Sequence, residues 1–143
     1  MTKIKLLAVF LFLIGGIFES KAQTYKFLTT GFSVMEKDEK GNWGKWSDLQ
    51  DASIVVTLDT KKDRIVVYSQ ELQLYRIVEY QAEQETEDDL TYPFSCAGED
   101  GEPVVITIIT RKKQNNRKQM YIAHRDVVLV YNIINYPEKG DRG

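Results

Sequence analysis

Residues 53–69 of the chain read SIVVTLDTKKDRIVVYS. Two runs of mostly β-branched residues stand on either side of the polar tetrapeptide TKKD, a composition typical of two strands joined by a short turn. In the first run, Ile54, Val56 and Leu58 fall on one face of an extended chain, because successive side chains of a strand point to opposite faces. This stretch therefore predicts an antiparallel pair of strands with one apolar face.

The same kind of pattern extends in both directions along the chain. Polar turn segments separate the apolar runs, among them GEDGEP at 98–103, and Pro93 marks an edge position or a bulge because it cannot donate to a sheet ladder. Nowhere do apolar residues recur with the spacing of three to four residues that is typical of a helix. The only helical candidate is one turn within 47–52. The strands expected are 24–37 (one long or two short strands), 53–59, 64–69, 74–82, 90–97, 104–112, 119–125 and 127–134.

Short connections join these strands, with neither a long crossover nor an internal repeat. They predict an all-β fold, a single-domain antiparallel meander of about eight strands within residues 23–143, of which 137–143 form a frayed tail. Such a meander must close into a barrel or stack as a sandwich, since open sheet edges invite aggregation. A closed or nearly closed β-barrel is favoured because Greek-key crossings need longer connections, and a β-sandwich is the alternative.

Residues 1–22 have the pattern of a secretory signal peptide. Two lysines precede the apolar run from Leu6 to Phe18, and Ser20 and Ala22 occupy the −3 and −1 positions of a small-residue cleavage site. The run is short for a membrane span, so a retained anchor is the less favoured alternative. We expect an exported protein, periplasmic or secreted, with no membrane anchor after signal cleavage.

The charge of the chain excludes one class of partner. Residues 1–22 hold three of the 19 basic and one of the 21 acidic residues, so the rest of the chain has 16 and 20 and a net charge near −4. A nucleic-acid partner would require a strongly basic face, so none is expected. The acidic loop 83–89 and the basic loop 112–118 are interpreted as solvated turns, and calcium binding by the acidic loop is the alternative for that segment.

Candidates for catalysis are few. Cys96 is the only cysteine and His124 the only histidine. No intramolecular disulfide can form, and Cys96 is expected to be a buried, inert thiol, although a Cys96–His124 dyad is conceivable. Glu79 is the one acid expected in the middle of a strand, where an outward position would make it an ordinary surface carboxylate. We therefore predict no metal site, no cofactor and no enzymatic activity.

The stretch Gly41-Asn42-Trp43 near the start of an exported β-meander resembles the Gly-x-Trp motif of lipocalins and related calycin barrels. The resemblance implies that Trp43 closes the base of the barrel against an arginine from near the last strand, here Arg125. It also implies a binder of small hydrophobic ligands.

Aromatic residues supply the candidate binding site. Trp43 and Trp46 would point to opposite faces if extended, one inward and one outward, and they are either packing residues or a ligand platform. Tyr75 and Tyr80, five residues apart on one expected strand, are also predicted to face opposite sides. The candidate ligand-binding residues are Trp43, Trp46, Tyr68, Tyr75, Tyr80 and Tyr92.

Two functions of different classes fit this sequence. The first is a non-enzymatic carrier of a small apolar or sugar-like ligand, held inside the barrel. The second is a protein–protein interaction module that has a filled core and uses its outer surface and charged loops. Bulky Ile, Val, Leu, Phe and Tyr occur on the faces of all the expected strands, which favours a filled interior.

Overall fold

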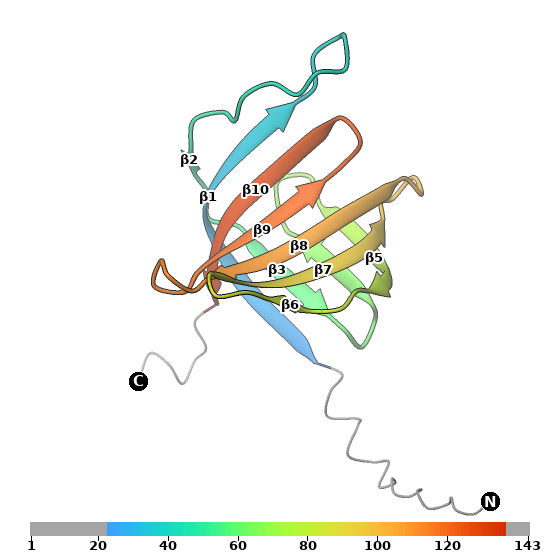
Figure 1. Cartoon of the computed structure of the whole chain (residues 1–143). Coiled ribbons are helices and arrows are strands. Elements are labelled where there is room, and N and C mark those ends of the chain that lie inside the picture. The colour runs from blue at the N-terminus through green and yellow to red at the C-terminus, as the bar shows by residue number, and fades with distance from the viewer. Residues whose placement is uncertain (1–22, 137–143) are drawn as a thin grey trace, which may run out of the picture.

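The computed structural model describes residues 23–136 and is all-β (Figure 1). The predicted signal peptide, 1–22, and the predicted tail, 137–143, lie outside the described residues. Between residues 23 and 136 there is no helix that could span a membrane. The strands are β1 (Thr24–Glu36), β2 (Gln50–Asp51), β3 (Val55–Asp59), β4 (Arg64–Val67), β5 (Gln73–Tyr80), β6 (Gln84–Glu85), β7 (Asp89–Ala97), β8 (Pro103–Arg111), β9 (Arg117–Ala123) and β10 (Val127–Asn135).

The strands form an antiparallel meander that closes on itself. Neighbours in the sheet follow the order β10-β9-β8-β7-β5-β4-β3-β1, and β10 pairs with β1 to complete an eight-stranded barrel. The two short strands β2 and β6 lie outside this ring and pair with β1 and β7. The predicted barrel is thus confirmed over the sandwich, and closure removes the open edges that a flat meander would expose.

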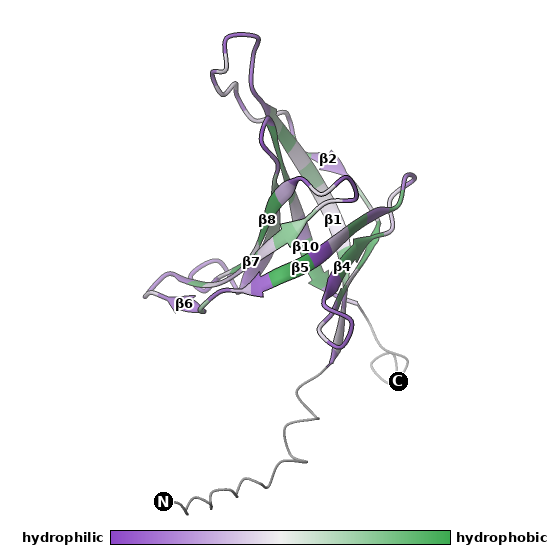
Figure 2. Cartoon of the chain, turned by 90° about the vertical axis from the view of Figure 1, so that its right-hand side faces the viewer, coloured by the Kyte–Doolittle hydropathy of each residue, from purple (hydrophilic) through white to green (hydrophobic). Residues whose placement is uncertain are grey.

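Hydrophobic side chains fill the middle of the barrel. Ile106, Met120 and Ile122 are completely buried at its centre. On β8 the inward residue Ile106 is 0% exposed whereas its neighbour Val105 is 42% exposed, as alternation in a strand requires. Figure 2 shows the complementary pattern, with hydrophilic loops at both ends of hydrophobic strands. The predicted filled interior is correct for this central layer.

A bulge in β1 keeps apolar side chains inside along the whole strand. The pairing register with β10 shifts between Thr29 and Gly31. Thr29, before the shift, is completely buried, and Phe32, after it, packs on the core with its ring centroid 6.0 Å from that of Tyr131. Because a bulge inserts one residue, the inward positions change from odd to even numbers across it.

The chain after β1 turns back and follows the edge of the same strand. The backbone N–H of Gly44 donates to Glu36 at 2.8 Å, and the N–H of Ser47 donates to Val34 at 2.8 Å. The Ser47 hydroxyl in turn accepts the Val34 N–H at 2.9 Å. The predicted helical turn within 47–52 is therefore wrong, because β1 offers the backbone of this segment partners along an extended path.

A second bulge, in β5, changes the direction of its last residues. The register with β7 shifts between Ile77 and Glu79. Ile77 pairs with the buried Cys96, and Tyr80 pairs with the buried Phe94, so both point inward. The prediction that Tyr75 and Tyr80 face opposite sides is therefore wrong, because the inserted residue restores Tyr80 to the face of Tyr75.

Pro93 lies at a local edge of β7. The pairing of β5 with β7 ends at Tyr80 and Phe94, and the pairing with β6 covers only Leu90 and Thr91. Pro93 sits between these two ladders, where its carbonyl accepts the N–H of Gln81 at 3.1 Å. The edge position predicted for this proline is confirmed, since no ladder needs an N–H there.

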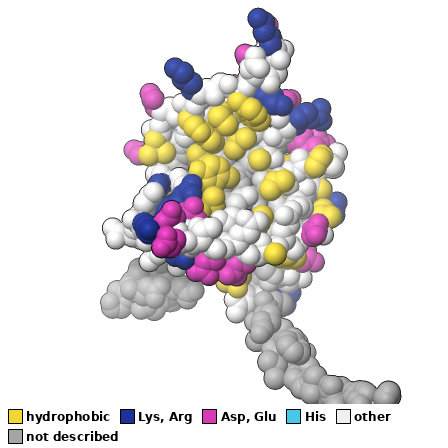
Figure 3. Space-filling model, viewed as in Figure 1, with side chains coloured by type: hydrophobic (Ala, Val, Ile, Leu, Met, Phe, Trp, Pro, Cys, Tyr) yellow, Lys and Arg dark blue, Asp and Glu magenta, His cyan; other side chains and the backbone are white. Residues whose placement is uncertain are grey.

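Apolar side chains gather on the outer face formed by β1, β10 and β9 (Figure 3). Trp46 contacts Tyr121 of β9 edge-on, with ring centroids 6.2 Å apart. Tyr121 pairs with Val130 of β10, which is only 9% exposed. The returning segment thus places Trp46 against the outer face of β9.

The acidic and basic loops lie beside each other at one end of the barrel. Lys112 is paired with Glu85 at 2.7 Å, and Lys113 with Asp88 at 3.1 Å. These pairs lie at the surface, so each contributes little to stability. They pair two of the five acidic residues in 83–89 with two of the four basic residues in 112–118.

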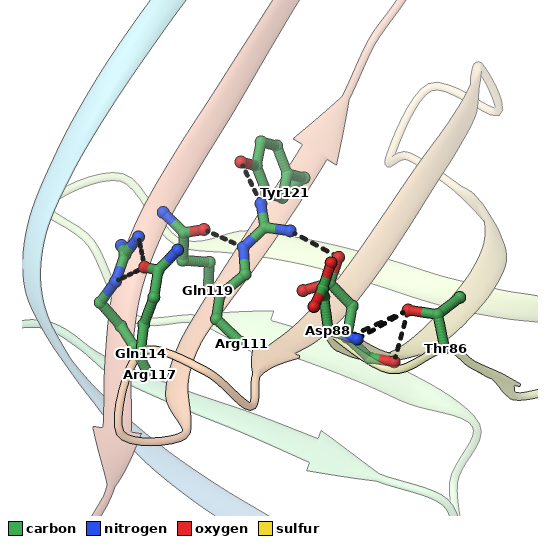
Figure 4. Close-up of polar contacts among 8 residues, drawn as sticks. Thr86, Asp88, Arg111, Gln114, Arg117, Gln119 and Tyr121 are labelled. Carbon is green, nitrogen blue, oxygen red and sulfur yellow. Dashed lines mark hydrogen bonds and ion pairs between the residues drawn. The ribbon is translucent and has the colours of Figure 1, made fainter.

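Arg111 connects the acidic loop to the barrel wall (Figure 4). Its guanidinium donates to Asp89 at 3.2 Å, to Gln119 at 3.1 Å and to the Tyr121 hydroxyl at 3.2 Å. A planar cation with three fixed acceptors holds the start of β7 against β8 and β9.

Cys96 is buried in the barrel wall, as predicted. The side chain is 4% exposed, and its thiol contacts the carbonyl of Phe94. Burial raises the pKa of the Cys96 thiol to about 11, so the reactive thiolate is absent at neutral pH.

Because the Cys96 thiol is buried, the free energy of unfolding is expected to decrease in the alkaline pH range. An unfolded cysteine titrates near about 8.5, whereas the folded thiol of Cys96 titrates at about 11. Between these values unfolding releases a proton, so the free energy of unfolding is expected to fall as the pH rises through the window. Urea unfolding at pH values near ~8, ~9.5 and ~11 should show a steeper loss for the wild type than for Cys96→Ala. Parallel losses in the two proteins would contradict the assignment.

Candidate functional site

A cavity of about 360 Å³ opens at one end of the barrel, and we refer to it as the cup. This is the end at which β1 begins and β10 finishes, and at which β8 turns into β9 (Figure 1). Inward-facing residues of seven barrel strands line it, every one except β4. Its volume lies within the range of about 300–1,000 Å³ that small-molecule sites occupy.

The floor of the cup is apolar. It consists of Phe27 from β1, Leu58 from β3, Phe94 from β7 and Ile108 from β8, each 7–8% exposed. All four belong to the same buried cluster as the central core. The cup is therefore the place where the packed interior stops short of the barrel end.

Three tyrosines form the rim of the cup. Tyr25, Tyr80 and Tyr92 are 43%, 45% and 39% exposed, with their rings above the apolar floor. The Tyr80 hydroxyl donates to Asp63 at 2.7 Å, and its ring meets Phe94 edge-on at 5.8 Å between centroids. These contacts hold one side of the opening in place.

The hydroxyls of Tyr80 and Tyr92 stay protonated at neutral pH. Burial, followed by the hydrogen bond and charge of Asp63, raises the pKa of Tyr80. Burial, followed by the charges of Glu83 and Glu85, raises the pKa of Tyr92. Both hydroxyls are therefore uncharged. The single O–H of Tyr80 donates to Asp63, so toward a bound molecule this hydroxyl can only accept a hydrogen bond.

One part of the wall of the cup is polar. Thr110 of β8, Lys118 of β9 and Asn135 of β10 come from three adjacent strands. The Lys118 ammonium donates to the Thr110 hydroxyl at 3.2 Å. Across residues 23–136, no carboxylate lies within ion-pair distance of Lys118.

A second cavity, also about 360 Å³, lies at the other end of the barrel beside His124. The Nδ1 atom of His124 is 2.7 Å from a carboxylate oxygen of Glu102, and Nε2 is 3.4 Å from the hydroxyl of Tyr75. That hydroxyl donates to Gln73 at 2.7 Å. Burial, followed by the charges of Tyr131 and Glu102, raises the pKa of Tyr75, so it is no activated nucleophile. These side chains thus satisfy one another's hydrogen-bonding groups at this end of the barrel.

The candidate catalytic residues are not brought together. Both ring nitrogens of His124 face Glu102 and Tyr75, and the Cys96 thiol contacts Phe94, so the conceivable Cys96–His124 dyad is not formed. Glu79 is exposed, the outward surface position that the sequence favoured. Among the described residues, no group of three His, Cys, Asp or Glu side chains is arranged to hold a metal ion.

The structure separates the six residues predicted to bind a ligand. Tyr80 and Tyr92 line the cup. Tyr75 faces inward but belongs to the cluster at the opposite end. Tyr68 follows β4 at that same far end and is 49% exposed, so it contributes nothing to the cup.

Both tryptophans lie on the outside of the barrel, so the expectation that one points inward is wrong. Trp43 is 44% exposed, and the Lys37 ammonium lies 5.1 Å from the centre of its ring. Trp46 is 42% exposed and lies against Tyr121 on the outer face of β9. Trp43 also does not close the barrel base against Arg125, which is exposed, because the hairpin after β1 carries the tryptophan away from the barrel.

Sequence reasoning missed most of the cup. Tyr25, Thr110, Lys118 and Asn135 stand near strand ends, where a strand pattern is weakest. The alternation of β9 was the available signal, since Lys118 is two residues from the buried Met120 and so shares its inward face.

Comparison with known proteins adds no relative. No protein-family model, no curated protein and no solved structure matches this chain. The cup and its lining are therefore the basis for a functional assignment.

Proposed function

We propose that this protein is an exported, non-enzymatic carrier that holds a small, largely apolar ligand in the cup. The observation that carries the proposal is the lining, in which a buried apolar floor lies below three half-exposed tyrosines. Concave, mainly apolar sites with a few polar groups are the usual setting of small-molecule binding. Aromatic rims add contact area at little entropic cost, because each ring has only two rotatable bonds.

The volume of the cup limits the size of the ligand. About 360 Å³ corresponds to roughly 12 times the ~30 Å³ that a water molecule occupies in the liquid. A bicyclic aromatic compound, or an alkyl chain of similar size, fits this space. 2-Naphthamide, a neutral bicyclic amide, is therefore a suitable probe.

Filling the cup is expected to abolish this binding. Ile108→Trp places a large ring in the floor, whereas Ile109→Trp, one residue further along β8, points outward and serves as the matched control. Calorimetric titration of the wild type with 2-naphthamide should give a Kd on the order of 10–100 μM, from roughly 0.5 kcal/mol per non-hydrogen atom. Ile108→Trp should weaken binding at least ~10-fold, and Ile109→Trp should bind as the wild type does.

Circular dichroism is needed alongside, because a larger core side chain can disturb packing. A folded Ile108→Trp variant that binds as tightly as the wild type would overturn the assignment to the cup. Failure of the wild type to bind the probe saturably would overturn the carrier function itself.

One observation favours a second candidate, a protein-interaction module. Apolar side chains gather on the outer face formed by β1, β10 and β9 (Figure 3). Two exposed apolar side chains on the outside of the barrel are Trp46, which lies against β9, and Val105 of β8, each 42% exposed. Contiguous apolar surface of this kind is typical of interaction sites when it is large. Native mass spectrometry of protein purified from its own source separates the candidates: a retained small molecule supports the carrier, and a retained protein supports the module.

A further inference from the structure

We infer that the ligand of the cup is an amphipathic anion, with an aromatic or alkyl body and a carboxylate-type head group bound by Lys118. The inference rests on the proposed carrier function and names the chemical class of its ligand.

The lining of the cup has a polar part and an aromatic part. Thr110, Lys118 and Asn135 form the polar part, on the three consecutive strands β8, β9 and β10. The tyrosines occupy other strands of the ring: Tyr92 on β7 and Tyr25 on β1 flank the polar part, and Tyr80 on β5 lies across from it. A ligand that satisfies both parts of the lining needs an apolar part and a polar part at opposite ends.

Among residues 23–136, Lys118 is the only charged side chain that lines the cup. Within the same residues, its ammonium has one hydrogen-bond partner, the neutral hydroxyl of Thr110, at 3.2 Å. An ammonium group has three N–H donors, so two remain for a ligand. A half-buried cation without a counter-ion attracts an anionic group more strongly than an exposed one does, because water screens it less.

The neighbouring cations are already engaged. Arg111 is paired with Asp89, Lys112 with Glu85 and Lys113 with Asp88. Arg117 donates to the side chains of Gln114 and Asn132, at 3.0 and 3.2 Å. Figure 4 shows Arg117 beside Gln114. Lys118 is thus the cation at this end that a ligand can reach from inside the barrel.

An acidic group at the mouth reinforces this orientation. Asp63 accepts the hydroxyl of Tyr80, and it lies in the turn between β3 and β4, across the ring from β9 and Lys118. Its carboxylate repels an anionic head group from that part of the mouth and directs it toward the ammonium.

Two isosteric probes test this inference. 2-Naphthoate and 2-naphthamide have the same shape, but only the first carries a charge at neutral pH. The wild type is expected to bind 2-naphthoate about 10-fold more tightly, the gain of a charge-assisted hydrogen bond. Lys118→Met should reduce this ratio to about 1 through loss of naphthoate affinity alone, and Lys118→Arg should keep a ratio above 1.

Lys113→Met is the matched control, since it removes a cation of the adjacent loop that is paired with Asp88 outside the cup. It should leave the ratio unchanged. Equal affinity of the wild type for both probes, or a Lys118→Met variant that keeps the preference, would overturn the inference and leave the carrier function standing. Binding of neither probe would instead overturn the carrier function.

Discussion

Replacing Ile106 by alanine is expected to lower the free energy of unfolding by about 2–5 kcal/mol. Ile106 is 0% exposed and lies in the central layer of the closed barrel, where β8 passes between β7 and β9. Truncation there removes three buried carbon atoms and leaves a cavity, because hydrogen-bonded strands on both sides prevent the wall from collapsing inward. Equilibrium unfolding in urea, followed by circular dichroism, measures the loss.

The control for this prediction lies on the same strand. Val105 is 42% exposed and points outward, so Val105→Ala should change the free energy of unfolding by less than about 1 kcal/mol. If Ile106→Ala proved as mild as Val105→Ala, the interior of the barrel would not be packed as described.

Replacing Thr29 by valine is expected to cost about 1–3 kcal/mol although the two side chains have nearly the same shape. Thr29 is completely buried, and its hydroxyl accepts the backbone N–H of Ile54 at 2.8 Å. This hydrogen bond joins the residue before β3 to β1, next to the bulge. Valine would leave the backbone N–H of Ile54 without an acceptor in a site largely shielded from water. An unsatisfied buried donor lowers the free energy of unfolding by more than a typical hydrogen bond adds to it.

Thr57→Val is the matched change for this test. Thr57 lies on β3 with its side chain half-buried, and its hydroxyl makes none of the hydrogen bonds found between residues 23 and 136. Its replacement should alter the free energy of unfolding by no more than about 0.5 kcal/mol. Similar effects of Thr29→Val and Thr57→Val in urea unfolding would show that the Thr29 hydroxyl does not hold this junction.

The proposed ligand-binding site and the residues that stabilise the fold lie in different parts of the barrel. Ile106 and Thr29 belong to the packed interior, whereas the cup is formed where that packing ends. Substitutions in the polar wall, such as Lys118→Met, should therefore change ligand preference with little effect on unfolding. Among residues 23–136, Lys118 forms no ion pair, so its removal leaves no carboxylate without a partner.

The sequence by itself determined the strands and their order. Alternating β-branched runs such as 53–59 and 104–112, separated by polar turns, specify elements whose inner face must be buried. Short connections then force neighbours in sequence to pair antiparallel, and the open edges of such a meander favour closure into a barrel. The meander follows from local chemistry, because each of these pairings depends on residues that are close in the chain.

Only the tertiary structure decided which side chains share the cup. Closure brings β1 beside β10, about 100 residues away, so that Phe27 pairs with Asn135 in the wall. The bulge in β5 places Tyr80 inside, although a strict alternation from Tyr75 would place it outside. A bulge of one residue leaves the composition of a strand unchanged but reverses every later side chain, so a pattern with a period of two cannot reveal it. The position of both tryptophans also depended on the tertiary structure. Hydrogen bonds to the edge of β1, rather than hydrophobicity, fix where the segment after β1 lies, and they place both side chains on the outside of the barrel.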